Sequence, residues 1–335
     1  METLAAGVTQ LRIQRFVNVY FVETGTPGEW VLIDTGLPGS HKSIIAAADA
    51  LFFPGTRPEA ILLTHGHIDH LGAARELADH WQVPVIVHPL ELPYVTGRAL
   101  YPPCDPTVGG SLAFMSRFFP SQLPNLNARA QTLNTDDPAV PYLMAWRWLH
   151  VPGHAPGQLA FFREADRTLI GGDAFATVHH DSIPAVLLGR PKISRAGTPF
   201  NYDWAAARQS VQTLAELAPN AIGCGHGPVI TGPEAAAGLH ALAADYPLPA
   251  HGRYVHEPAR TDANGVGHLP PAPADKLPLQ AAIIGGSLLV AGAAWLLTGS
   301  RRSSKQPAHA STNEGDAPAY HSPEPIRPER RGVGS

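Results

Sequence analysis

Three histidines and one aspartate lie close together in the stretch "THGHIDH" (64–70). The apolar run "AILLT" (60–64) predicts a buried strand, and "HLGAARELADHW" (70–81) predicts a helix after it. A strand end followed by a helix N-terminus places the four side chains at one edge of a sheet, where the helix dipole adds positive character. Neutral imidazole and carboxylate groups suit Zn, Fe and Mn. The stretch therefore predicts a metal site formed by His65, His67, Asp69 and His70.

Three more residues of ligand type lie elsewhere in the chain, each with glycine nearby. His154 is part of "PGHAPGQ", Asp173 of "LIGGDAF" and His226 of "GCGHGPV". Glycine permits the close approach and unusual backbone angles of a crowded site. Each residue alone has a simpler interpretation, because a single histidine in a turn is usually structural. Together the seven ligands are about what two four- to five-coordinate metal ions need when one carboxylate bridges them and a water is shared.

These motifs resemble a known family. "THGHIDH", "PGHAPGQ", "GGDAF", "GHG" and "LIDTG" (32–36) are similar to motifs of the metallo-β-lactamase superfamily, and within it of the glyoxalase II-like hydrolases. The resemblance covers roughly residues 10–245. It implies an α/β fold of the four-layer αββα sandwich type. It also implies two divalent metal ions at one edge of this sandwich, with Zn as the first candidate and Fe or Mn as alternatives.

The resemblance also implies a role for each motif residue. The first metal would be held by His65, His67 and His154, and the second by Asp69, His70 and His226. Asp173 would bridge both metals. Asp34 would accept a hydrogen bond from the far nitrogen of a ligand histidine and so orient it. For Asp34 an alternative stays open, in which it caps the turn or helix after its strand.

The chemistry expected from this resemblance is hydrolysis of a small-molecule ester, thioester or lactone. A water that bridges the two metals is acidified, and the resulting hydroxide attacks the substrate. Asp69 is the candidate catalytic residue, which orients the water and relays a proton to the leaving group. Two alternatives are a mono-iron oxidoreductase of the persulfide dioxygenase type and a catalytically silent binding protein of the same fold. The complete set of seven ligands favours the dinuclear hydrolase.

Some positions depart from known members. Asp173 occupies the bridging position and no cysteine ligand is seen, which makes β-lactam hydrolysis doubtful. Ala174–Ala176 lack the tyrosine that homoserine-lactone lactonases often carry there, and no basic cluster for glutathione is recognisable. His179 and His180 either line the pocket or are exposed loop histidines. Cys224 is interpreted as a packing residue.

The length, the net charge and the remaining sequence patterns indicate the partners and the domain organisation of the chain. At 335 residues with a net charge of −4, it has no basic surplus, which argues against nucleic acid as a partner. Strand and helix patterns alternate over residues 1–88, as in the α/β class. We expect a catalytic domain over 1–246, and its aromatic, proline-containing excursion at 89–141 is interpreted as a lid or, alternatively, as an insertion that packs down. Residues 247–276 resemble a Pro-rich wrapping segment or linker.

The C-terminal region predicts a membrane anchor. Residues 277–299 contain no charged residue, and about 20 apolar residues suffice for a transmembrane helix. Small residues at four-residue spacing within this single helix would permit helix pairing and a homo-oligomer. The alternative is a buried C-terminal helix of the catalytic domain. Residues 300–335 have the composition of a disordered tail. The sequence thus predicts a single-pass membrane protein with a cytoplasmic catalytic domain.

Overall fold

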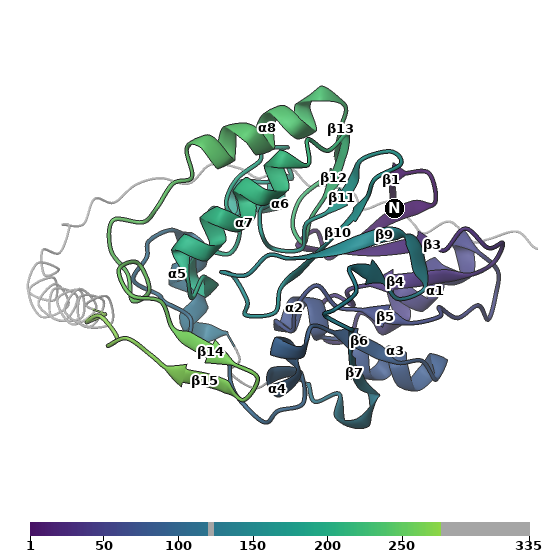
Figure 1. Ribbon diagram of the computed structural model, residues 1–335, viewed down its shortest axis with the longest axis horizontal. Coiled ribbons are helices and arrows are strands. Elements are labelled where there is room, and N and C mark those ends of the chain that lie inside the picture. The colour runs from purple at the N-terminus through teal and green to yellow at the C-terminus, as the bar shows by residue number, and fades with distance from the viewer. Residues whose placement is uncertain (120–123, 276–335) are drawn as a thin grey trace, which may run out of the picture. The chain divides into compact units, whose positions relative to one another are not determined.

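The computed structural model describes residues 1–119 and 124–275, and two β-sheets lie at its centre (Figure 1). Within these residues the first sheet has seven strands in chain order, of which β4 to β7 run parallel. Its strands are β1 (Glu2–Ala5), β2 (Val8–Ile13), β3 (Val17–Glu23), β4 (Trp30–Ile33), β5 (Ile61–Leu62), β6 (Val85–Val87) and β7 (Ala130–Thr132).

The second sheet has six strands within the described residues, in the order β13-β12-β11-β10-β9-β8. Its strands pair antiparallel, except that β11 and β12 run parallel. The strands are β8 (Ala139–Val140), β9 (Leu143–His150), β10 (Leu159–Arg163), β11 (Thr168–Ile170), β12 (Ala221–Gly223) and β13 (Ile230–Thr231).

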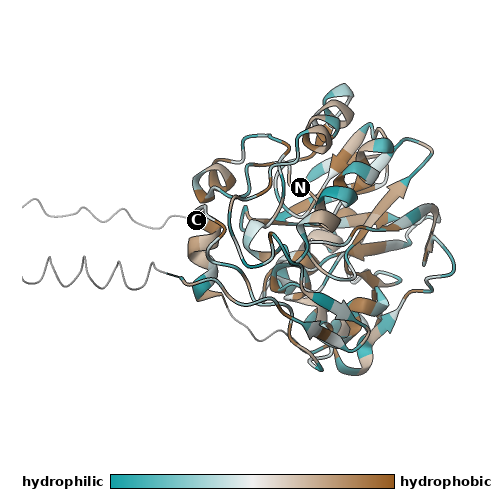
Figure 2. Cartoon of the chain, turned by 60° about the vertical axis from the view of Figure 1, so that its left-hand side comes forward, coloured by the Kyte–Doolittle hydropathy of each residue, from teal (hydrophilic) through white to brown (hydrophobic). Residues whose placement is uncertain are grey.

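Strand β3 shows why the two sheets stack face to face. Alternate side chains point to opposite faces of a strand. Val19 and Phe21 belong to the apolar core between the first sheet and its helices, whereas Tyr20 and Val22 belong to the core between the two sheets. Both faces of β3 are therefore buried, which explains its nearly continuous apolar sequence. Figure 2 shows brown, hydrophobic stretches along strands of the molecule, interrupted by hydrophilic ones.

Helices cover the outer face of each sheet. Ile44 of α1 (His41–Leu51) and Leu77 of α3 (Ala74–Trp81) pack into the core of the first sheet. Val211 of α7 (Trp204–Glu216) and Leu239 of α8 (Pro233–Ala244) pack into that of the second. The order helix, sheet, sheet, helix is the predicted αββα sandwich, so that prediction is confirmed (Figure 1). The predicted C-terminal single helix lies outside the described residues.

The helix predicted at 70–81 is instead two helices, α2 (Ile68–Leu71) and α3. Gly72 lies at the break, and a Cβ there would collide with the backbone of Leu37 and Pro38. The lack of a side chain at Gly72 therefore allows the loop after β4 to pack against the short helix that contains Asp69 and His70. The break therefore brings two of the predicted motifs together.

The predicted excursion at 89–141 is partly integrated into the sandwich, because β7 extends the first sheet and β8 the second. The interpretation as a lid stays a prediction. Its helices are Pro89–Glu91 (3-10), α4 (Leu92–Val95), α5 (Ser111–Met115), Ser116–Phe118 (3-10) and Asn127–Arg129 (3-10). Two further short helices follow β11, namely α6 (Ile183–Leu188) and the 3-10 helix Thr198–Phe200.

The segment after α8 packs on the sandwich. It contains a hairpin of β14 (Arg260–Asp262) and β15 (Gly265–His268). The backbone N–H of Ala259 donates to Tyr202 O, and the hydroxyl of the buried Tyr254 donates to Pro103 O. The compact unit accordingly extends from Met1 to Asp275.

The prediction of a single-pass membrane protein is wrong for the chain as far as the structure describes it. None of the helices in 1–119 and 124–275 is long and apolar enough to cross a membrane. The 13 residues of α7 extend about 20 Å, whereas the hydrocarbon core is about 30 Å thick. The segment 277–299 and the tail 300–335, on which the prediction was based, lie outside the described residues. We therefore withdraw the membrane assignment and the helix pairing that depended on it.

Candidate metal centre

All seven predicted ligand residues lie together at one edge of the sandwich. Strands β5, β11 and β12 end close to this edge, and the loop between β9 and β10 also reaches it. Atoms of ligand type lie within 4.8 Å of one another in four overlapping groups, of which three consist of the seven predicted ligands and the fourth contains Asp173, His180 and His226. The three groups of predicted ligands are His65, His67 and His154; His65, His70 and Asp173; and Asp69, His70 and His226.

The first group, here called the three-histidine cluster, consists of His65, His67 and His154. The Nδ1 atom of His67 lies 3.0 Å from Nε2 of His65 and 2.9 Å from Nε2 of His154. The Nδ1 of His154 faces Asn201 Oδ1 at 3.1 Å, so this nitrogen carries the proton and Nε2 presents a lone pair. Burial, followed by the neighbouring histidines, lowers the pKa of His65 and His67 well below the usual value, and burial also lowers that of His154. The cluster therefore presents neutral imidazoles, as a cation requires.

The second group, here called the mixed cluster, consists of Asp69, His70 and His226. Asp69 Oδ2 lies 3.3 Å from Nε2 of His226 and 3.8 Å from Nε2 of His70. The Nδ1–H of His226 donates to Phe16 O over 2.6 Å. Burial disfavours the charged form of both histidines, but the surrounding carboxylates outweigh it. They raise the pKa of His70 well above its usual value and that of His226 to about 10.

Asp173 lies between the two clusters. Its Oδ2 is 3.6 Å from Nε2 of His154 and 3.1 Å from Nε2 of His226, and its Oδ1 is 3.5 Å from Nε2 of His70. Burial opposes ionisation, yet His226 and His70 hold the pKa of Asp173 well below its usual range. Asp173 Oδ1 and His70 Nε2 are buried with no hydrogen-bond partner among the described residues. Unpaired buried polar atoms are costly. Divalent cations within these groups would satisfy both atoms, so the residues present fit two metal ions.

Asp34 orients one histidine of each cluster, His70 directly and His65 through Thr64. Its Oδ2 accepts hydrogen bonds from His70 Nδ1 at 2.7 Å and from Thr64 Oγ1 at 2.8 Å, and its Oδ1 accepts from Thr64 N. The Thr64 hydroxyl also lies 3.1 Å from His65 Nδ1. The carboxylate thus points Nε2 of His70 toward Asp173. Asp34 is buried and has a positive φ of 61°, an uncommon conformation outside glycine that this network supports.

Known proteins resemble this chain. The family model of the metallo-beta-lactamase superfamily matches residues 12–226. The chain belongs to the metallo-β-lactamase superfamily. The probable metallo-hydrolase YflN of Bacillus subtilis (strain 168) is 40% identical over 230 residues, which cover 68% of this chain and 86% of that protein.

One more distant relative by sequence and one solved structure are also similar to this chain. A hydroxyacylglutathione hydrolase of Xanthomonas axonopodis pv. citri (strain 306) is 25% identical over 210 residues, covering 62% of this chain and 60% of that protein. The crystal structure of TTHA1623 in a di-iron-bound form is 31% identical, has a TM-score of 0.47, and covers 68% of this chain and 97% of that chain.

Sequence reasoning missed Glu91, a buried carboxylate that joins two ligand loops of this metallo-β-lactamase superfamily member. Its Oε2 accepts from Gly66 N at 2.8 Å and from the Tyr101 hydroxyl, and its Oε1 accepts from Gly157 N at 2.6 Å. Burial raises its pKa. Glu91 therefore fixes the loop of His65 and His67 to the loop that follows His154. It lies in "HPLELP", which has no recognisable motif, so no signal in the single sequence identified it.

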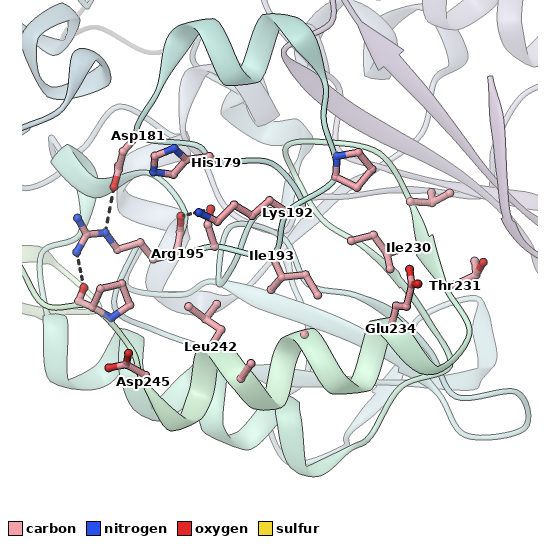
Figure 3. A pocket seen from close by; sticks show the side chains of 16 residues that line it. His179, Asp181, Lys192, Ile193, Arg195, Ile230, Thr231, Glu234, Leu242 and Asp245 are labelled. Atoms are coloured by element: carbon pink, nitrogen blue, oxygen red, sulfur yellow. Dashed lines mark hydrogen bonds and ion pairs between the residues drawn. The ribbon is translucent and has the colours of Figure 1, made fainter.

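The adjacent residues His179 and His180 have different environments. His180 is buried, and one of its ring nitrogens lies within 4.8 Å of ligand atoms on Asp173 and His226. His179 instead lines a cavity of about 910 Å³ beside α8, to which none of the seven ligand residues contributes (Figure 3). Cys224 is buried, its pKa is raised to about 11 by burial, and its thiol contacts Thr177 and the backbone of His226. This environment is consistent with packing.

Proposed function

We propose that this chain is a dinuclear metal-dependent hydrolase of a small ester, thioester or lactone. The observation that carries the proposal is the position of Asp173. One carboxylate faces ligand atoms of both clusters, and its Oδ1 has no hydrogen-bond partner among the described residues. A carboxylate in this position suits a bridge between two cations.

The residues divide between two cation positions. The three-histidine cluster would hold one cation and the mixed cluster the other, with Asp173 shared. Nitrogen and carboxylate ligands of this kind suit Zn, Fe and Mn, and Zn is our first candidate. When bound, such cations polarise a substrate oxygen and lower the pKa of a water toward neutrality.

Asp69 is proposed to hold the attacking water and to carry a proton to the leaving group. Its side chain is 30% exposed, whereas those of His70, His154, Asp173 and His226 are nearly inaccessible. Burial opposes its ionisation, but His70 and His226 hold the pKa of Asp69 well below its usual value. An ionised, accessible Oδ atom is the form that accepts a hydrogen bond from water.

Two aromatic side chains support an acyl substrate. The ring of Phe200 lies 5.2 Å from that of His67 and 5.9 Å from that of His154. Phe119 stacks on Phe200 with the ring centroids 5.8 Å apart and the planes at 6°. Phe119 is 36% exposed, so the pair forms an accessible apolar wall beside the three-histidine cluster. Such a wall suits the carbon chain of an ester, thioester or lactone. The similarity to a hydroxyacylglutathione hydrolase also supports a thioester.

The test uses purified full-length protein that is stripped of metal and reloaded separately with Zn, Fe or Mn. Each form is assayed on a panel of esters, thioesters, lactones and phosphodiesters. We expect metal-dependent hydrolysis of at least one acyl substrate, which Asp69→Asn reduces strongly even at metal concentrations that refill both cation positions. Absence of acyl hydrolysis in every loaded form, or activity that survives metal removal, would overturn the proposal.

A further inference from the structure

His180 packs directly against the mixed cluster although no motif predicted a role for it. Its ring centroid lies 3.9 Å from that of His226, at an interplanar angle of 32°. The residue is only 6% exposed. A ring nitrogen lies within 4.8 Å of ligand atoms on both Asp173 and His226. His180 is therefore close enough to act on a group bound at the mixed cluster.

The hydrogen bond to the other ring nitrogen determines which tautomer His180 adopts. Gly197 N–H donates to Nδ1 over 2.9 Å. A neutral imidazole that accepts at Nδ1 carries its proton at Nε2. Because Nδ1 accepts this hydrogen bond it carries no proton, and the ring in this geometry is the neutral Nε2–H tautomer. Nε2 has no hydrogen-bond partner among the described residues and remains a free donor.

Comparison with two ligand histidines distinguishes His180 from them. Nδ1 of His154 faces the side-chain oxygen of Asn201, and Nδ1 of His226 faces the carbonyl of Phe16. In both, Nδ1 meets an acceptor, which leaves a lone pair at Nε2 for a metal. In His180, Nδ1 meets a donor, so Nε2 has no lone pair to offer. His180 is thus a hydrogen-bond donor rather than an eighth ligand.

The loop that fixes His180 is itself constrained. Gly197 has a φ of +37°, and a Cβ there would collide with the ring of His154. The side-chain face of this glycine therefore packs on the three-histidine cluster while its N–H holds His180. Ser194 Oγ also accepts from His180 N at 3.4 Å. A donor held before the substrate arrives needs no reorganisation during the reaction.

We propose that the Nε2–H of His180 donates a hydrogen bond to the substrate oxygen that gains negative charge at the mixed cluster. The donor would bind this oxygen more strongly as the charge develops and would so lower the barrier. No proton is transferred in this role, since the proton stays on Nε2 of His180 while Nδ1 accepts from Gly197 N–H. The inference rests on the proposed hydrolase function, because it assumes an acyl substrate at the cluster.

The first test compares His180→Leu and His180→Gln with His179→Leu, whose wild-type side chain lines the cavity outside the metal centre. For a substrate found in the panel, we expect His180→Leu to lower kcat roughly 10- to 100-fold, with little change in KM and unchanged metal content. His180→Gln retains an N–H donor and should recover part of the loss. His179→Leu should remain within about twofold of wild type, because exposed positions rarely matter.

The second test does not need activity. Nitrogen-15 NMR of the histidine rings in Zn-loaded full-length protein should show one neutral ring protonated at Nε2 that disappears in His180→Leu. Three outcomes would overturn the inference: protonation of that ring at Nδ1, loss of metal in His180→Leu, or full kcat in His180→Leu. If wild-type protein hydrolyses no acyl substrate, the proposed function fails, and with it the substrate contact, while the NMR result still reports the tautomer separately.

Discussion

The two clusters of the metal centre use different means to hold similar histidines. In the three-histidine cluster, His154 is fixed by the neutral amide of Asn201, and burial lowers the pKa values. In the mixed cluster, His70 is fixed by the carboxylate of Asp34, and nearby carboxylates raise the pKa values despite burial. His154 and His226 both face Asp173 and Asp69, but the hydrogen bonds that His226 makes with these carboxylates outweigh its burial, whereas burial dominates at His154. Only the mixed cluster must release protons to bind a cation.

The largest effect is expected from the residue that both clusters share. Asp173→Ala should release at least one metal ion and reduce hydrolysis by more than about 100-fold, since even a residue that only orients a ligand contributes about 10- to 100-fold. His65→Ala should also release metal. Metal analysis and turnover measure both effects.

Asp166→Asn, which alters a partly exposed aspartate on the β10–β11 turn, is the matched control and should retain both ions. Full metal content and full turnover in both Asp173→Ala and His65→Ala would contradict the ligand assignment.

Substitutions of Asp34 and of Asn201 should weaken different cation positions, because each residue holds a histidine of a different cluster. Asp34→Asn removes the charge that orients His70 and should weaken the second cation about 10- to 100-fold, with a smaller effect on the first through Thr64. Asn201→Leu removes the partner of His154 and should weaken the first cation instead. Competition with a chelator measures both affinities. Equal losses at both positions in both variants would mean that the clusters are not separately supported.

The pKa difference predicts how many protons each cation displaces. At pH 7, which is below the raised pKa of about 10 for His226, this ring is protonated in the metal-free protein and must lose its proton when a cation binds. The three-histidine cluster is already neutral at pH 7 and should release none. Calorimetry in two buffers of different ionisation enthalpy should show release with one cation only, and the part of it that comes from His226 should disappear as the pH rises through about 10. Equal release with both cations would refute the electrostatic comparison.

The smallest effect is expected from the apolar wall beside the three-histidine cluster. Phe119→Ala removes the ring that stacks on Phe200 and should raise KM several-fold, because about 1 kcal/mol of aromatic contact is lost, without changing metal content. Phe53→Ala, at an exposed phenylalanine in the segment after α1, is the control. If KM is unchanged for every substrate hydrolysed, the wall does not contact the substrate, and the interpretation of the 89–141 excursion as a lid loses its support.

The parts predicted from sequence were those that local patterns encode. The "THGHIDH" stretch and three glycine-flanked residues identified a group that the fold does bring together, and strand and helix periodicity identified the sandwich. Glu91 and Asn201 were not identified as parts of the centre, and His180 was left as either a pocket histidine or an exposed one, because each acts through contacts with segments distant in sequence. The break at Gly72 was missed for the same reason, since it depends on the loop at 37–38.

The most direct test of the account is the metal stoichiometry of single-cluster variants. Native mass spectrometry of full-length wild-type protein should show two divalent ions per chain. His154→Ala should retain one ion, held by the mixed cluster, and His226→Ala should retain one ion, held by the three-histidine cluster. A wild-type chain that binds one ion or none after loading, or variants that both keep two ions, would contradict a dinuclear centre built from two clusters around Asp173.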